Sequence, residues 1–134
     1  MGVVSELLCL ATAIFFEARG EPLEGQYAVA DVIMNRVEDN RYPDNVCDVV
    51  NEPKQFSYTH DGASDDPQSL TNVLDKRAWG VAQEVATDAL TGAPRVYKAT
   101  HYLKVGIDTS WSKSYVYEGT VGQHKFYINN TKYR

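Results

Sequence analysis

Two glutamates at the end of an apolar segment are the first candidates for chemistry. Glu17 and Glu21 lie four residues apart in the run FFEARGEP, and Gly20 and Pro22 interrupt a continuous helix there. Glu17 follows Leu10 by seven residues, so on a helix it points within about 20° of the Leu10 direction. Burial at the end of an apolar face raises the pKa of a carboxyl group toward the range that suits a general acid.

Each glutamate also has an explanation without catalysis. Spacing alone favours a surface ion pair of Glu17 with Arg19 or Arg36. Glu21 could be a partner carboxylate, but it is explained better as favourable charge at the N-terminus of the next helix. The helix pattern by itself therefore makes Glu17 a candidate general acid but does not decide its role.

Metal and nucleophile chemistry receive little support from the spacing. His60, His101 and His124 are far apart and form none of the short motifs that anchor zinc. The acidic loop at residues 61–66 lacks the alternating ligands of a calcium loop. No G-x-S-x-G segment surrounds a serine. We therefore expect no metal and no cofactor.

The second half of the chain is rich in aromatic residues. The whole sequence contains nine Tyr, two Trp and four Phe. Exposed rings beside hydroxyl groups suit a sugar groove, because flat rings pack against the apolar faces of pyranoses. A buried strand core explains the same pattern equally well. The candidates are Phe56, Tyr58, Tyr102, Trp111 and Tyr127.

Hydrophobic periodicity predicts helices first and strands later. Helices are expected at residues 5–19, with Ser5 as N-cap and Gly20 after the C-terminus, at 22–37, at 46–51 and at 70–90. Residues 51–69 are expected to form a long loop. Strands are expected within residues 95–103 and 114–128, with turns or bulges at Gly106, Gly119 and Gly122. This order indicates an α+β fold with a small antiparallel sheet.

Size and charge narrow the function classes. We expect residues 1–134 to form one domain, and a monomer. The net charge of −5 argues against nucleic acid as the main partner. We expect no membrane span, because no run of about 18 apolar residues occurs. We expect no signal peptide either, because Met1–Glu6 lacks a basic residue. Whether Cys9 and Cys47 pair stays open.

Several motifs together resemble a known family. The segment CLATAIFFEARGEPLEGQYAVADVIMNRV resembles the opening of the SleB-type cell-wall hydrolases, which include spore-cortex-lytic enzymes. The resemblance continues through RYPDNVCDVV, QFSYTHDG, AWGVAQEVA, ATHY and VGQHKFY, from about residue 7 to 127. One departure is the run TGAPRVYKATHYL, which is longer and more basic than the family pattern. A second is Leu103, where the family often has His.

The resemblance implies a fold related to lytic transglycosylases and goose-type lysozymes. It also implies peptidoglycan glycan strands as substrate and Glu17 as the catalytic residue. In the substrate cleft it places Gln55, Phe56, Ser57 and Tyr127, and we add Glu21, His101, Tyr102 and Trp111 as substrate-binding candidates.

The mechanism expected is that of a lytic transglycosylase, which forms 1,6-anhydromuramic acid with one glutamate. A phage endolysin and a trimmed bacterial domain are both compatible with this activity. In either case the site of action is the wall, in the periplasm or outside the cell, and the export route is open.

Three alternatives remain at this point. A hydrolytic muramidase would use Glu21, or an aspartate of residues 61–66, as second carboxylate. A zinc-dependent amidase would use His60, His101 and His124. A wall-binding module would bind peptidoglycan without cleaving it.

Overall fold

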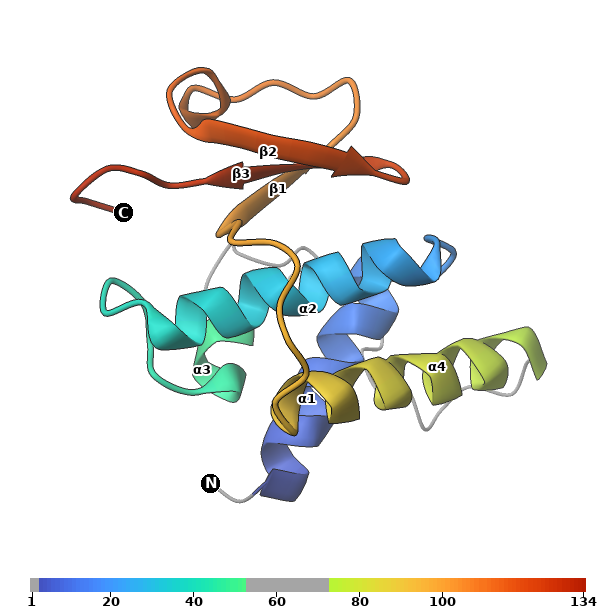
Figure 1. The fold of residues 1–134 in the computed structure, drawn as a ribbon. Helices are drawn as coiled ribbons and strands as arrows, with labels where there is room; N and C mark the ends of the chain where they lie inside the picture. The colour runs from blue at the N-terminus through green and yellow to red at the C-terminus, as the bar shows by residue number, and fades with distance from the viewer. Residues whose placement is uncertain (1–2, 53–72) are drawn as a thin grey trace.

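The computed structural model describes residues 3–52 and 73–134 (Figure 1). In chain order the elements are α1 (Val3–Ala18), α2 (Leu23–Glu38), α3 (Val46–Val50), α4 (Val73–Leu90), β1 (His101–Lys104), the 3-10 helix η3 (Trp111–Lys113), β2 (Val116–Val121) and β3 (His124–Ile128). The sheet lies above α2, and α1 and α4 pack against α2 from below. The predicted α+β class is confirmed. The loop predicted at residues 51–69 falls mainly outside the described residues.

The first helix differs from the prediction at its start and agrees at its end. α1 begins at Val3, so the predicted N-cap at Ser5 is wrong. A cap residue needs non-helical backbone, and Ser5 lies inside the helix. At the other end Gly20 has a φ of +85°, and the N–H of Glu21 donates to the Ala18 carbonyl at 3.0 Å. Glycine adopts this left-handed conformation without strain and ends the helix here.

The apolar faces of α1 and α2 form the centre of the core. On α1, Leu10, Ile14 and Phe15 are fully buried. The side chains predicted to be buried on α2 are inside as well, since Ala28, Val29, Val32 and Ile33 are fully buried and Val37 is partly buried. Pro22 is the residue before α2 rather than the first helical residue, and its carbonyl accepts from Gln26 at 3.1 Å.

A disulfide joins α1 to α3, which settles the open question of the two cysteines. Cys9 and Cys47 are bonded, and their Cα atoms lie 5.3 Å apart. The bond closes a loop across 38 residues of sequence. Cross-links of this kind stabilise a fold chiefly by restricting the unfolded chain. The bond ties α1 to α3 two helical turns before Glu17.

The last helix matches its predicted inner face. Ala82, Val85 and Ala86 of α4 are buried, and Trp79 is partly buried with its ring edge-on to Phe15 at 5.9 Å. The helix ends at Leu90, and Gly92 follows with a φ of +97°. The face of α4 that carries these residues therefore packs on α1.

Within the described residues the strands form one antiparallel sheet in the order β1-β3-β2. β3 lies in the centre, and pairs with Tyr102 of β1 through Phe126. A register irregularity between Tyr117 and Gly119 confirms the predicted bulge in β2. Because side chains alternate along a strand, the sheet has two different faces. The inner face, defined by Tyr102, Val121, His124 and Phe126, packs toward the helical core.

The outer face of the sheet carries a second group of rings. It is defined by His101, Tyr117 and Tyr127, with Trp111 and Tyr115 from the η3 segment packed against them. These five residues lie outside the main hydrophobic core cluster. The sheet therefore separates two packing layers, a core layer and an aromatic layer.

The segment before β1 is extended but belongs to no sheet, so the predicted strand at residues 95–103 is too long. Side chains of α2 take the place of a neighbouring strand. Asp31 Oδ2 accepts from the N–H groups of Val96 and Tyr97 at 3.1 and 3.0 Å. Asn35 Nδ2 donates to the carbonyls of Tyr97 and Ala99, both at 2.9 Å.

Arg36 of α2 continues this series of bonds. Its Nε donates to the Thr100 carbonyl at 2.7 Å, and the residue is only 5% exposed. Burying a guanidinium lowers the stability of the fold unless its N–H donors are hydrogen-bonded. The bond to the Thr100 carbonyl satisfies one of these donors and holds the chain in place at residue 100. The three polar residues on α2 thus set where β1 begins.

Candidate active site

Glu17 lies in the last turn of α1 and is half-buried. The helix end that carries it is held from several directions. Arg19 forms an ion pair with Asp75 of α4, and its guanidinium carbon lies 4.8 Å from the centre of the Phe15 ring. The N–H of Arg19 also donates to the Phe15 carbonyl at 3.2 Å. This turn is therefore a fixed platform, as a catalytic carboxyl group requires.

Glu21 lies just beyond that turn, beneath the connection between β2 and β3. Its side chain is 10% exposed. Oε1 accepts a hydrogen bond from the backbone N–H of Gln123 at 2.8 Å. His124 Nδ1 lies 3.0 Å from the same oxygen but makes no hydrogen bond to it. The carboxylate of Glu21 is thus engaged with the β2–β3 turn.

His124 and Tyr102 continue this arrangement along the inner face. Their rings lie 4.9 Å apart, and Tyr102 also contacts Phe126 at 5.7 Å. Burial lowers the pKa of His124 from its ordinary value, and the nearby Glu21 carboxylate opposes part of that shift. His124 is consequently neutral at pH 7 and close to a negative charge.

His101 occupies a different environment on the outer face. Its ring lies 4.8 Å from Trp111 and 5.0 Å from Tyr115, and Thr100 Oγ1 is 2.9 Å from its Nδ1. Burial lowers the pKa of His101 to about 3, and the positive charge of Arg36 and other arginines adds to the shift. This imidazole therefore stays neutral over the whole physiological range.

The structure divides the predicted substrate-binding residues into two groups. On the inner side, Glu21 and Tyr102 both contact His124. His101, Trp111 and Tyr127 lie together on the outer side, where Trp111 is 5.5 Å from Tyr127. Gln55, Phe56 and Ser57 lie outside the described residues.

Of the three histidines considered as zinc ligands, the two that the structure describes do not lie together. His101 and His124 project from opposite faces of the sheet, so the two cannot bind one metal ion together. His60 lies outside the described residues. Among the residues that the structure describes, no group of three or more His, Cys, Asp or Glu side chains could hold a metal ion.

Sequence reasoning missed the polar residues of α2. No role was predicted for Asp31 or Asn35, and Arg36 was considered only as a surface ion-pair partner of Glu17. Asp31 and Arg36 are nevertheless buried, and all three residues hold residues 96–100. Burial raises the pKa of Asp31, and its bonds to backbone N–H groups oppose the rise. Asp31, Asn35 and Arg36 are four and one residues apart, a spacing that could have suggested a shared helix face. It could not have identified residues 96–100 as the segment that this face binds.

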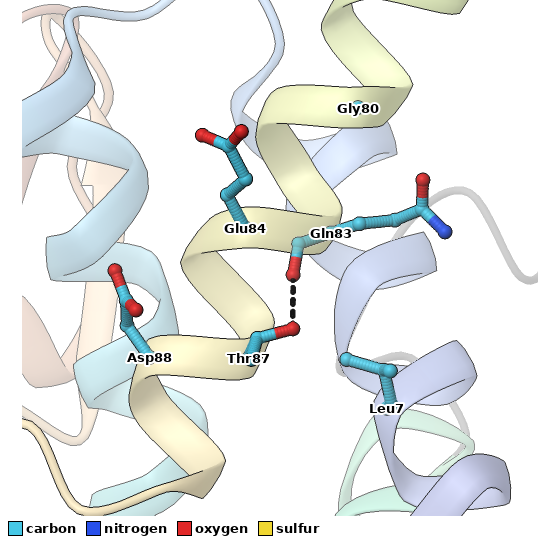
Figure 2. A pocket seen from close by; sticks show the side chains of 6 residues that line it. All are labelled: Leu7, Gly80, Gln83, Glu84, Thr87 and Asp88. Atoms are coloured by element: carbon cyan, nitrogen blue, oxygen red, sulfur yellow. Dashed lines mark hydrogen bonds between the residues drawn. The ribbon is translucent and has the colours of Figure 1, made fainter.

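A shallow groove between α1 and α4 lies apart from these residues. Figure 2 shows its lining, in which Leu7 of α1 lies on the side of α4 that carries Gln83 and Thr87, and Glu84 points away from Leu7. Leu7 precedes Glu17 by ten residues, about 15 Å along a helix. This groove is therefore separate from the end of α1. None of the described helices has the length and apolar character needed to cross a bilayer.

Comparison with known proteins identifies the family. A sequence profile described as Cell Wall Hydrolase matches residues 20–127. The chain belongs to the cell wall hydrolase family. The spore cortex-lytic enzyme of Oceanobacillus iheyensis is 34% identical over 125 residues, which is 91% of this chain and 41% of that protein. The Bacillus subtilis spore cortex-lytic enzyme is 32% identical over 91% of this chain and 37% of its own length.

Two solved catalytic domains share the fold of this cell wall hydrolase. The catalytic domain of SleB from Bacillus anthracis, a germination-specific lytic transglycosylase, has a TM-score of 0.72 and 29% identity, and covers 91% of this chain and 93% of that one. The catalytic domain of Bacillus cereus SleB has a TM-score of 0.75 and 30% identity over 95% and 92%. The predicted SleB-type resemblance is confirmed. The chain spans less than half the length of the curated relatives it matches.

Proposed function

We propose that this cell wall hydrolase is a lytic transglycosylase that cleaves the bond between N-acetylmuramic acid and N-acetylglucosamine in peptidoglycan. Support comes from the similarity to SleB catalytic domains, one of which is described as a lytic transglycosylase. Further support comes from the fixed helix end that carries Glu17. Tyr102, which is partly exposed beside His124, offers a flat ring to a sugar substrate.

In this mechanism Glu17 acts first as an acid and then as a base. Its carboxyl proton passes to the glycosidic oxygen while the bond from that oxygen to muramic acid C1 breaks. The carboxylate then takes the proton of the muramic acid C6 hydroxyl, whose oxygen bonds to C1 and closes the 1,6-anhydro ring. Glu17 ends protonated, ready for the next cycle, and no water is consumed.

The observation that carries this choice over hydrolysis is the engagement of Glu21. An inverting hydrolase needs a second carboxylate about 6.5–9.5 Å from the first to activate water, and a retaining one needs it at about 5–5.5 Å. Glu21 is the nearest candidate in sequence, yet its Oε1 bonds the Gln123 N–H and contacts His124. With that carboxylate engaged, the tethered C6 hydroxyl is favoured over water by proximity.

Replacement of Glu17 tests the proposal. We expect Glu17→Gln to lower the rate of sacculus digestion by about 10²–10⁴-fold with little change in melting temperature, because the amide cannot transfer the proton. Glu84→Gln, an exposed replacement on α4, is the matched control and should keep the wild-type rate. Digestion at the wild-type rate by Glu17→Gln would refute the assignment.

The products decide between transglycosylation and hydrolysis. Sacculi are digested with the wild-type protein, and the muropeptides are weighed without borohydride reduction. Anhydro products are lighter than hydrolytic products by one water and have no reducing end. A spectrum dominated by reducing-end muramic acid would favour the muramidase, and binding without any cleavage would favour the wall-binding module.

The type of peptidoglycan on which the protein acts can be identified by comparing substrates. The rates of digestion of spore cortex and of vegetative sacculi are compared: a preference for cortex would favour a germination enzyme, and a preference for vegetative sacculi would favour a phage endolysin. We infer action by a monomer outside the cytoplasm. The Cys9–Cys47 disulfide supports this site of action, because such bonds persist in oxidising compartments.

A further inference from the structure

The β2–β3 turn is shaped around the Glu21 carboxylate. Gly122 has a φ of +57°, which favours glycine. A Cβ atom at Gly122 would lie 2.9 Å from Glu21 Oε1 and 3.0 Å from Oε2, and also 2.9 Å from Pro22 Cδ. These distances are shorter than real Cβ contacts allow, so the turn approaches the carboxylate as closely as backbone can. The next residue, Gln123, supplies the N–H that bonds Oε1 at 2.8 Å.

His124 extends the contact from the turn to the inner face. Nδ1 is buried and faces Glu21 at 3.0 Å, and the ring contacts Tyr102 at 4.9 Å. Tyr102 lies on β1 and pairs with Phe126 of β3. A shift of the Glu21 carboxylate would therefore move the turn, His124 and Tyr102 together.

The other end of this connection is the helix that bears Glu17. The Glu21 N–H donates to the Ala18 carbonyl at 3.0 Å, which places Glu21 against the residue next to Glu17. Gln26 Nε2 donates to the Glu21 carbonyl at 3.3 Å and fixes the same residue from α2. Glu21 thus links the helix junction to the sheet through both its backbone and its side chain.

We propose that Glu21 is a positioning residue for the reaction at Glu17. Through Gln123 and His124 it sets the position of the β2–β3 turn and of Tyr102 relative to the end of α1, and it is not a second catalytic carboxylate. This inference rests on the proposed function, because it assigns a role relative to Glu17. Displacements of about 1 Å in an active site can cost about 10²-fold in rate, so such a link has a measurable effect.

Two replacements of Glu21 separate positioning from catalysis. Glu21→Gln keeps an acceptor oxygen for the Gln123 N–H, so we expect only a three- to tenfold loss of kcat/KM on soluble glycan fragments. Glu21→Ala removes the acceptor, and we expect a loss of about 30-fold or more, chiefly in KM. A second carboxylate would behave differently, since Glu21→Gln would then lower kcat by 10²-fold or more. That result would overturn the proposal.

A change in the turn that leaves Glu21 intact supplies the matched variant. Gly122→Ala forces the turn away from the carboxylate, so we expect it to reproduce the KM effect of Glu21→Ala. Full activity of Gly122→Ala would overturn the proposal. If this variant does not fold, His124→Ala replaces it, because it removes the contacts of the ring with Glu21 and Tyr102. We expect His124→Ala to raise KM as Glu21→Ala does, and an unchanged KM would overturn the link through His124.

The titration of His124 gives a readout that a purely structural role would leave unchanged. Glu21 raises the pKa of His124 against the effects of burial and Lys104. We expect NMR titration of the folded Glu21→Gln protein to show a lower His124 pKa than the wild type. An unchanged His124 titration would overturn the coupling of Glu21 to His124.

The two proposals fail in different ways. Reducing-end products from the wild type would refute the transglycosylase mechanism and leave the Glu21 comparison untouched. Anhydro products from the wild type together with an inactive, folded Glu21→Gln protein would keep the mechanism and refute the positioning role.

Discussion

The two faces of the sheet place the same residue type in contrasting surroundings. His124 on the inner face lies beside the Glu21 carboxylate, whereas His101 on the outer face lies among Trp111, Tyr115 and the positive charge of Arg36. Burial lowers the pKa of both imidazoles, but a carboxylate opposes the shift in one case and arginines add to it in the other. The inner face therefore places an imidazole beside a carboxylate, whereas the outer face places one among aromatic rings and arginines.

The largest expected effect concerns packing on the two faces. Phe126 on the inner face is fully buried, so Phe126→Ala should lower the free energy of unfolding by about 3–5 kcal/mol. Trp111 on the outer face is only half-buried, so Trp111→Ala should cost about 2 kcal/mol. Urea unfolding of both variants measures the difference. Equal losses would show that the outer face belongs to the same core.

The second effect concerns the substrate. We expect Tyr102→Ala to raise KM for glycan fragments about tenfold, because Tyr102 lies on the face that Glu21 and His124 occupy. Trp111→Ala should raise KM less, about two- to threefold, at temperatures well below its melting point. Initial rates over a range of substrate concentrations test this order. A larger KM effect at Trp111 would assign the sugar to the outer face.

The smallest effect is a pH dependence of stability from His101. Its folded pKa of about 3 lies below the ordinary 6.5, so between these values the unfolded chain binds more protons than the folded protein. The stabilisation from neutral His101 is complete above pH 6.5 and is lost as the pH falls toward 3. His101→Phe keeps a ring but cannot titrate, so its melting temperature should fall less than that of the wild type between pH 7 and 4.

Calorimetric scans at several pH values check this prediction. Gln83→Ala on the exposed surface of α4 is the control and should follow the wild-type curve. Parallel curves for His101→Phe and the wild type would mean that folding does not lower the pKa of His101.

Local sequence patterns were sufficient to predict features that depend on a single helix, bulge or turn. The 3.6-residue period of α1 placed Glu17 at the end of the helix, and the left-handed backbone at Gly20 confirmed its predicted end. Gly119 and Gly122 likewise marked a bulge and a turn. In these positions the backbone requirement of one or two residues is enough to fix the structure.

Contacts between distant segments could not be predicted in this way. The spacing that makes α2 amphipathic identifies its apolar face but gives no role to Asp31, Asn35 and Arg36. Their partners at residues 96–100 lie more than 60 residues away. The pairing of Cys9 with Cys47 was open for the same reason. A polar residue near an apolar face is explained only when the group that satisfies it is known.

The sequence by itself determined the order of helices and strands and the position of Glu17 on α1, because each depends on residues close together in the chain. The tertiary structure alone decided that β3 is the central strand, that His101 and His124 face opposite ways, and that Glu21 lies under the β2–β3 turn. The physical reason is that a carboxylate's chemistry depends on which donors and charges surround it. For Glu21 these donors come from residues about a hundred positions along the chain.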